Sequence, residues 1–313
     1  MKNSEKLYFI VGMPRAGTTF LSTLLNEHEE VCSTGETLFF GRFFIPPHDG
    51  INYNKRQISD LLKRFKTIRY HNSSQLKIQN IYDNLDEEFE KLGDFANPRQ
   101  VFGAFGDAFK LAQKKSVFIE KTPHHIQYTD RILNFFPETK FIVLMRDPYE
   151  WMLSYKFQGS QKSTELRSIF KKIYHPITAA LVWKKNYYAI NRLKKYQSSQ
   201  YLILKNSELT NIESLYKIED FLGIKKQSIT IDRKNSSFKT IEKPHLDDID
   251  IFWMNLISEK SILEANYVLK NYSIGIVDFF KSLLKMIVAL LSIYKYIPTK
   301  KNKFLYLFNY LKK

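Results

Sequence analysis

The chain of 313 residues carries a formal net charge of +16, with 44% hydrophobic and 15% aromatic residues. This length and hydrophobic content exclude a disordered chain and allow one large domain or two small ones. The single cysteine, Cys32, excludes an internal disulfide and a cysteine-rich zinc site, and favours a reducing compartment. The positive charge indicates an anionic partner, or else only a lysine-rich composition.

The N-terminal residues run directly into a strand-like segment, without the apolar stretch of a secretory signal, so we expect a cytoplasmic protein. Apolar runs then alternate with segments of helical periodicity, which predicts a three-layer α/β/α domain with a central parallel sheet. The predicted strands are residues 7–13, 31–35, 116–121, 140–147 and 201–206. The polar stretch 56–114 predicts helical insertions, and further helices are expected at 18–28, 125–138, 149–157 and 175–196.

The segment 12–19 (GMPRAGTT) has the spacing of a phosphate-binding P-loop between a strand and a helix. Backbone amides and the positive end of the helix bind an anion in such a loop. Thr18 stands where ATP-binding loops have a lysine, and Arg15 supplies a cation inside the loop instead. The pattern predicts a site for one 5′-phosphate with a group attached, without metal; the alternative is an ordinary strand–helix turn.

A second candidate anion site follows the strand at 140–147. Arg146 lies at the carboxyl end of this strand, where α/β proteins bind ligands. Asp147 and Pro148 predict the start of a helix, and Ser154 lies two turns into it. Arg146 and Ser154 therefore predict a second phosphate site, or else a surface Arg–Asp pair and an ordinary helical serine.

The C-terminal segment 276–313 contains eight lysines and one acid, Asp278. We divide the chain into a main domain, 1–275, and this basic amphipathic segment. Its longest uncharged apolar run, residues 286–294, is too short to span a bilayer. Lysines beside large apolar residues predict an interfacial helix on anionic lipid; the alternatives are a helix packed on the domain or a partner-facing surface.

Three motifs in this order, GMPRAGTT, EKTP (120–123) and FIVLMRDPYEWMLSY (141–155), resemble the sulfotransferases that use 3′-phosphoadenosine 5′-phosphosulfate (PAPS). The resemblance extends from residue 7 to about residue 240 and is nearest to the bacterial and Golgi-type glycan sulfotransferases. It is weaker to the cytosolic small-phenol enzymes, whose strand-end Lys-Thr-His motif is not reproduced. It implies a P-loop NTPase-like sulfotransferase fold, PAPS as co-substrate, adenosine 3′,5′-bisphosphate (PAP) as product, and no required metal.

The resemblance also implies roles for individual residues. The 3′-phosphate site falls on Arg146 and Ser154, and a nucleotide-contacting loop on Arg233 and Asn235. The 5′-phosphosulfate site falls on the loop residues Arg15, Ala16, Gly17, Thr18 and Thr19.

Sulfuryl transfer needs a cation at the transferred group and a base for the acceptor. Lys121 ends a predicted strand and is expected to reach the bridging or sulfuryl oxygens; the alternative is a surface lysine paired with Glu120. For the base the resemblance favours Glu36, in GETLFF (35–40), if burial raises its pKa. His124 and then His125 are the next candidates, because imidazole titrates near neutral pH.

These observations predict a PAPS-dependent sulfotransferase that acts on a hydroxyl or amine of a small molecule, a carbohydrate or a lipid-linked glycan. We expect a cytoplasmic enzyme, peripheral at the inner face of a membrane, and no nucleic-acid partner. The alternatives are a P-loop kinase-like protein for nucleotides or small molecules, and a non-catalytic module that binds anions or membranes. Residues 41–114 are expected to build the acceptor side, with aromatic side chains at Phe43, Phe44, Tyr53, Phe102 and Phe105.

Overall fold

The computed structural model describes residues 6–41, 52–68, 75–158, 168, 171–227, 229 and 244–296. The chain divides into two compact units, Met1–Arg146 with Tyr188–Lys234, and Asp147–Tyr187 with Asn235–Lys313. Each unit is described by itself below. The division predicted at residue 275 stays a prediction.

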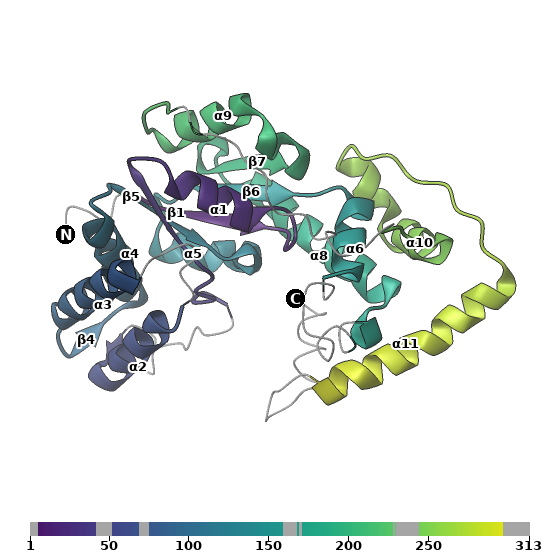
Figure 1. Cartoon of the computed structure of the whole chain (residues 1–313), viewed down its shortest axis with the longest axis horizontal. Helices are drawn as coiled ribbons and strands as arrows, with labels where there is room; N and C mark the ends of the chain where they lie inside the picture. The colour runs from purple at the N-terminus through teal and green to yellow at the C-terminus, as the bar shows by residue number, and fades with distance from the viewer. Residues whose placement is uncertain are drawn as a thin grey trace. The chain divides into compact units, whose positions relative to one another are not determined.

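A five-stranded parallel sheet in the order β2-β5-β1-β6-β7 forms the centre of the first unit (Figure 1). Every residue of β1, β5 and β6 is buried, as expected for central strands that are covered on both faces. The predicted strands are therefore confirmed, with shorter ends. The strands are β1 (Leu7–Gly12), β2 (Val31–Thr34), β5 (Val117–Lys121), β6 (Phe141–Met145) and β7 (Tyr201–Lys205).

Helices cover both faces of this sheet. Successive strand residues point to opposite faces, so Phe118 and Lys121 of β5 lie on different sides. The Phe118 ring packs against Phe105 and Phe109 of α4, with ring centroids 5.6 and 5.4 Å apart. Lys121 donates a hydrogen bond to Thr19 of α1 on the other side. This arrangement confirms the three-layer α/β/α architecture.

The other elements of the first unit surround this sheet. A short antiparallel pair, β3 (Tyr53–Asn54) and β4 (Phe95–Ala96), accompanies the helical insertion. The helices of the unit are α1 (Thr18–Asn26), α2 (Lys55–Lys66), α3 (Gln75–Glu90), α4 (Pro98–Gln113), α5 (Thr129–Phe135) and α9 (Ile212–Leu222), with 3-10 turns η2 (Pro123–Tyr128), η3 (Leu193–Lys195), η4 (Ser198–Gln200) and η5 (Asn206–Thr210).

The helical insertion confirms the predicted helices at 56–114 but places their aromatic residues differently. Phe102 and Phe105 are 0% exposed and Tyr53 is 1% exposed, so these rings belong to the core. Phe102 of α4 stacks on Phe9 of β1 at 5.8 Å, which shows that α4 packs on the sheet. Phe43 and Phe44, the other expected acceptor-side aromatics, lie outside the described residues.

The second unit is helical. It contains α6 (Pro148–Lys156), the first part of α8 (Pro176–Arg192), α10 (Asp248–Glu264) and α11 (Ile276–Tyr296). The side chain of Asp147 accepts bonds from two first-turn amides of α6, as predicted for this N-cap. Lys156 at the other end of α6 donates to Asp247 and Asp250, at 2.8 and 2.7 Å.

α11 is the predicted basic amphipathic C-terminal helix (Figure 1). One side packs on α10, where Trp253 stacks on Phe279 at 5.6 Å and donates to Ser282. Another side is exposed and apolar, with Val277, Phe280, Leu284, Ile287, Val288 and Leu291 each more than half exposed. Within the described part of the chain, no helix combines the length and hydropathy needed to cross a bilayer.

Candidate active site

The carboxyl ends of the parallel strands bring the predicted residues of the first unit to one edge of the sheet. The loop after β1 carries Arg15, β5 ends at Lys121, and Arg146 follows β6. Glu36 lies two residues beyond β2. Parallel strands collect residues from distant parts of a sequence in this way, because all their carboxyl ends meet at the same edge.

The loop after β1 has a backbone that depends on its glycines. Gly12 has φ 125° beside β6, where a Cβ would lie 2.2 Å from the carbonyl oxygen of Leu144. Gly17 has φ 93° and forms the N-cap of α1 without a side-chain cap. The amides in the first turn of α1 therefore have no side-chain cap and point toward the loop. Arg15 itself has φ 68°, an uncommon conformation for a residue with a Cβ.

Asn206 supports this loop from the end of β7, and the sequence did not single it out as a site residue. Its side-chain amide donates to the carbonyl oxygen of Ala16 at 2.7 Å. A Cβ on Gly17 would meet the same amide nitrogen at 2.7 Å, so the small residue allows the close approach. Asn206 follows a predicted strand, and this position at the end of a strand was the only sequence signal for it.

Two arginines of the predicted phosphate sites lie together. The Arg146 guanidinium donates to the backbone carbonyl of Arg15 at 2.9 Å. Burial lowers the pKa of Arg15, and the nearby charge of Arg146 lowers it further. Two adjacent cations destabilise each other, and a bound anion relieves this repulsion. The pair therefore forms a positively charged end of the loop suited to phosphate.

Lys121 connects the loop to the predicted base. Its ammonium group donates to Glu36 Oε1 at 3.1 Å and to Thr19 Oγ1 at 3.3 Å. The Lys121 side chain is 2% exposed, whereas that of Glu36 is 43% exposed. Lys121 is therefore more than a surface lysine paired with its neighbour Glu120, the alternative considered above. The described residues therefore leave Glu36 accessible at the edge of the sheet.

The two histidines of the EKTPHH segment have different surroundings. His125 is buried; its Nδ1 lies 2.9 Å from Glu120 Oε2, and its Nε2 accepts a bond from the Phe40 amide at 3.3 Å. Both ring nitrogens are thus engaged in the protein interior. His124 is half-buried in η2 and has interactions of its own. This geometry favours Glu36 over His125 as the group that meets an acceptor.

Glu120 is a buried carboxylate that the sequence suggested only as a possible partner of Lys121. Its Oε1 accepts bonds from the amide and hydroxyl of Thr37, at 3.1 and 2.8 Å, and from the hydroxyl of Thr122 at 2.5 Å. Its Oε2 faces His125. Because alternate strand residues face opposite sides, Glu120 and Lys121 act on different faces of β5. Glu120 faces the loop that follows Glu36, and Lys121 faces Glu36 itself.

This network binds four successive backbone amides of the loop after Glu36. Glu120 accepts the Thr37 amide, and Thr122 accepts the Leu38 amide at 3.3 Å. The amide of the third residue, Phe39, donates to the Thr37 hydroxyl at 3.2 Å, and that of the fourth donates to His125. Side chains thus supply the bonds that a regular element would provide, and the loop is held in one conformation beside Lys121.

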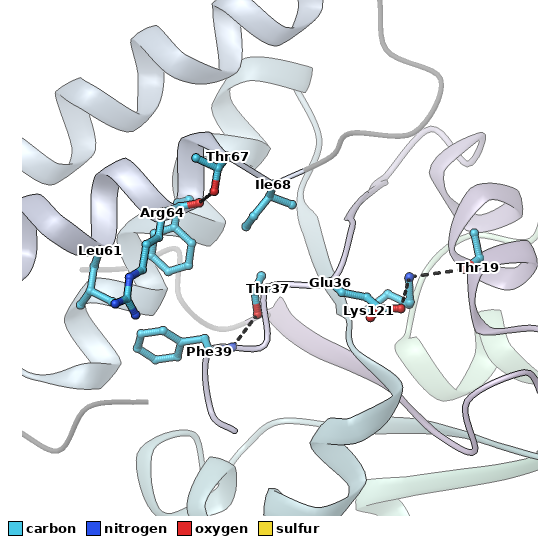
Figure 2. A pocket seen from close by; sticks show the side chains of 10 residues that line it. Thr19, Glu36, Thr37, Phe39, Leu61, Arg64, Thr67, Ile68 and Lys121 are labelled. Atoms are coloured by element: carbon cyan, nitrogen blue, oxygen red, sulfur yellow. Dashed lines mark hydrogen bonds and ion pairs between the residues drawn. The ribbon is translucent and has the colours of Figure 1, made fainter. Parts of the chain in front are cut away.

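A cavity of about 580 Å³ opens between this loop and α2 (Figure 2). Glu36, Lys121 and Thr19 line one end of it. The rest of the lining comes from the loop after Glu36 and from α2 with the residues after it: Thr37, Phe39, Leu61, Arg64, Phe65, Thr67 and Ile68. This volume suits a small-molecule ligand or part of a larger one.

The remaining predicted site residues belong to the second unit or lie outside the described residues. Ser154 is buried in α6 of the second unit, and its predicted role stays a prediction. Arg233 and Asn235 lie outside the described residues. A search of the described part of the chain finds no cluster of three or more metal-binding side chains.

The chain is similar to several sulfotransferases of known structure. No curated protein sequence matches the chain. Similar solved structures include the sulfotransferase domain from the curacin biosynthetic pathway (17% identity, 85% of this chain and 98% of that one, TM-score 0.48) and a sulfotransferase from Alicyclobacillus acidocaldarius (15%, 84% and 96%, 0.48). A mouse sulfotransferase complexed with PAP is also similar (13%, 98% and 83%, 0.38).

The sequence pattern of the sulfotransferase family matches residues 8–228, from the first strand to beyond α9. This range is most of the chain and contains the loop after β1, Glu36, Lys121 and Arg146. The chain therefore belongs to the sulfotransferase family and is a sulfotransferase enzyme.

Proposed function

We propose that this enzyme transfers the sulfuryl group of PAPS to a hydroxyl or amine of an acceptor bound in the cavity beside Glu36. The observation that carries the proposal is the position of Lys121, whose ammonium group contacts both Glu36 and Thr19. One lysine thus joins the candidate base to the candidate phosphate loop. The family and its PAP-bound mouse member support a PAPS nucleotide as the donor.

The donor supplies an activated sulfuryl group. The protein must bind the donor, stabilise the developing charge and remove a proton from the acceptor. Arg15, Arg146 and the first-turn amides of α1 are proposed to hold the two phosphate groups. Lys121 stabilises negative charge on the transferred oxygens. The Glu36 carboxylate removes the proton of the acceptor hydroxyl or amine, so that the acceptor's lone pair forms the new bond to sulfur. The bond between sulfur and the bridging oxygen of the 5′-phosphate breaks at the same time, and PAP leaves with that electron pair. Ser154, Arg233 and Asn235 remain proposed contacts of the nucleotide, and no metal ligand is included.

The residues present fit such a nucleotide. Two arginines in contact, a helix start without a side-chain cap and two glycines with positive φ surround the loop. A loop of this kind binds phosphate through its amides, and neighbouring guanidinium groups neutralise the charge.

Thermal unfolding with PAP tests the nucleotide site. PAP without Mg²⁺ should raise the Tm of the wild type by several degrees when present well above its Kd. Arg15→Ala should abolish this rise while its own Tm stays near the wild-type value. Lys63→Met, at an exposed position of α2, is the control. A rise with ATP and Mg²⁺ but none with PAP would instead indicate a kinase-like protein and would contradict the proposal.

Radiolabelled sulfuryl transfer tests the candidate base. Glu36→Gln should lose transfer to every acceptor in a panel of alcohols, amines and glycans while PAP still stabilises the variant, because glutamine cannot accept the proton. Transfer at the wild-type rate by Glu36→Gln would assign the base elsewhere, with His124 next. A protein that binds PAP but transfers to no acceptor in the wild type would support a non-catalytic anion-binding module.

The acceptor and the location in the cell remain part of the proposal. The family resemblance suggests a carbohydrate or lipid-linked glycan, used by a cytoplasmic enzyme at the inner face of a membrane. The exposed apolar side of α11 and its lysines, Lys281 and Lys285, favour anionic lipid as a partner. Co-sedimentation should show more binding to phosphatidylglycerol vesicles than to phosphatidylcholine vesicles, and Leu284→Glu should reduce it. Equal binding of that variant, or none by the wild type, would contradict a role for α11.

A further inference from the structure

The cavity beside Glu36 has two chemically different ends. Glu36, Lys121 and Thr19 form the transfer end. Figure 2 shows Arg64 well separated from the Glu36–Lys121 pair, with Thr37 and Phe39 between them in this view. An acceptor that fills the cavity therefore meets a second set of residues away from its reacting group.

Much of the remaining lining of the cavity is apolar. Phe39 and Phe65 line it, and their ring centroids lie 5.8 Å apart. Phe65 also stacks on Phe105 of the core at 4.1 Å, so its ring is fixed in place. Leu61 and Ile68 add aliphatic surface on the α2 side. These side chains offer a strongly hydrated sugar few hydrogen bonds, but they suit an aliphatic or aromatic body.

Arg64 gives the far end a positive charge. It lies one turn after Leu61 on α2, and it is exposed to solvent. Among the described lining residues, Arg64 and Lys121 are the cations and Glu36 is the sole acid, so the lining carries a net positive charge. Guanidinium binds carboxylate and phosphate through two parallel hydrogen bonds, which makes Arg64 a suitable contact for an acidic group.

We infer that the acceptor is an amphiphilic anion. Its hydroxyl or amine lies at Glu36 and Lys121, its apolar body lies against Phe39 and Phe65, and its carboxylate or phosphate group lies at Arg64. This inference rests on the proposed function for the identity of the transfer end. It narrows the acceptor from the wider class of carbohydrates to molecules in which an apolar segment separates the nucleophile from an acid.

Isothermal titration calorimetry with matched probes tests the inference in the full chain, with and without PAP. The probes are 10-hydroxydecanoate, its phosphate analogue 10-hydroxydecyl phosphate, and neutral 1,10-decanediol. We expect at least one acid to bind roughly tenfold or more tightly than the diol, because a hydrogen bond to a charged group adds that much affinity. Comparison of the two acids distinguishes carboxylate from phosphate.

Arg64→Met should remove the preference for the acid while leaving diol binding unchanged. Lys63→Met, which removes an adjacent cation that does not line the cavity, should keep the preference. Equal affinity for acids and diol, no binding of any probe, or an unchanged preference in Arg64→Met would overturn the inference. Failure of the proposed function is seen separately, as the absence of PAP stabilisation.

Discussion

Glu120→Gln tests whether the buried network holds the loop after Glu36. Glu120 is 0% exposed, and its Oε1 accepts three bonds that a glutamine oxygen can keep. The new amide group then faces Nδ1 of His125. Nε2 of that ring accepts the Phe40 amide, so Nδ1 carries the proton and two donors face each other. In the other tautomer of His125, Nε2 carries the proton and faces the Phe40 amide, so two donors again face each other.

The expected loss of stability follows from the number of hydrogen-bonding groups that each substitution leaves without a partner. One buried donor is left unsatisfied in either tautomer, so Glu120→Gln should lower the free energy of unfolding by about 1–3 kcal/mol. Glu120→Ala removes every acceptor and should cost about 3–5 kcal/mol. Glu90→Gln, at the exposed end of α3, is the control and should change stability by no more than about 0.5 kcal/mol.

The difference between wild type and Glu120→Gln should depend on pH. Burial by itself raises the pKa of Glu120, but His125 and the bonds from Thr122 and Thr37 outweigh it and hold the pKa below the ordinary 4.5. A carboxyl with a depressed folded-state pKa stabilises the protein fully above its ordinary pKa, and this contribution is lost as the pH falls through the folded-state pKa. The advantage of the wild type should therefore be complete near pH 7 and shrink below pH 4.5.

Urea unfolding followed by circular dichroism at pH 7 and pH 4 measures these differences from the midpoints at equal m-value. Stabilisation by PAP should survive in Glu120→Gln, because the phosphate loop follows a different strand. The transfer rate should fall with the loss of a fixed position for Glu36. Stability of Glu120→Gln within about 0.5 kcal/mol of the wild type at pH 7 would show that Glu120 does not hold this loop.

Three further predictions concern other parts of the chain. Gly103→Ala should stabilise the protein by about 0.5–1 kcal/mol, because the added Cβ meets open space. Gly106→Ala should destabilise the protein, because its Cβ would lie 2.9 Å from the Phe118 ring. The urea midpoints of the two variants should therefore shift in opposite directions. Burial raises the pKa of the Cys32 thiol to about 12, so native protein at pH 8 should not react with a thiol-specific disulfide reagent until urea unfolds it. Lys156→Met should lower the free energy of unfolding by about 3–5 kcal/mol, since it leaves Asp250 buried without its cation. Adding Asp250→Asn to this variant should recover part of the lost stability. If the two substitutions instead have purely additive effects, a direct pairing of the two side chains would be contradicted.

Local patterns in the sequence were sufficient for the architecture. Continuous apolar runs predicted the buried strands, since a strand covered on both faces has no polar side. The spacing of Gly12 and Gly17 and the Asp147-Pro148 pair predicted a phosphate loop and a helix start, because both depend on backbone conformations set by neighbouring residues. The alternation of strands and helices implied the parallel sheet, and the order of the three motifs implied the sulfotransferase family. Arg15, Lys121 and Arg146 were identified as candidates at this level, and the family resemblance added Glu36.

Tertiary structure alone decided what these residues contact. Glu120 meets Thr37 across 83 positions and Asn206 meets Ala16 across 190, and no local pattern encodes such pairs. The same holds for the cavity, where Arg64 from an insertion helix lies across from Glu36. Sequence reasoning placed Phe102 and Phe105 beside the acceptor, because an aromatic residue suits a binding face and a core equally well. Packing on the sheet put them inside and left Phe39, Phe65 and Arg64 to line the site.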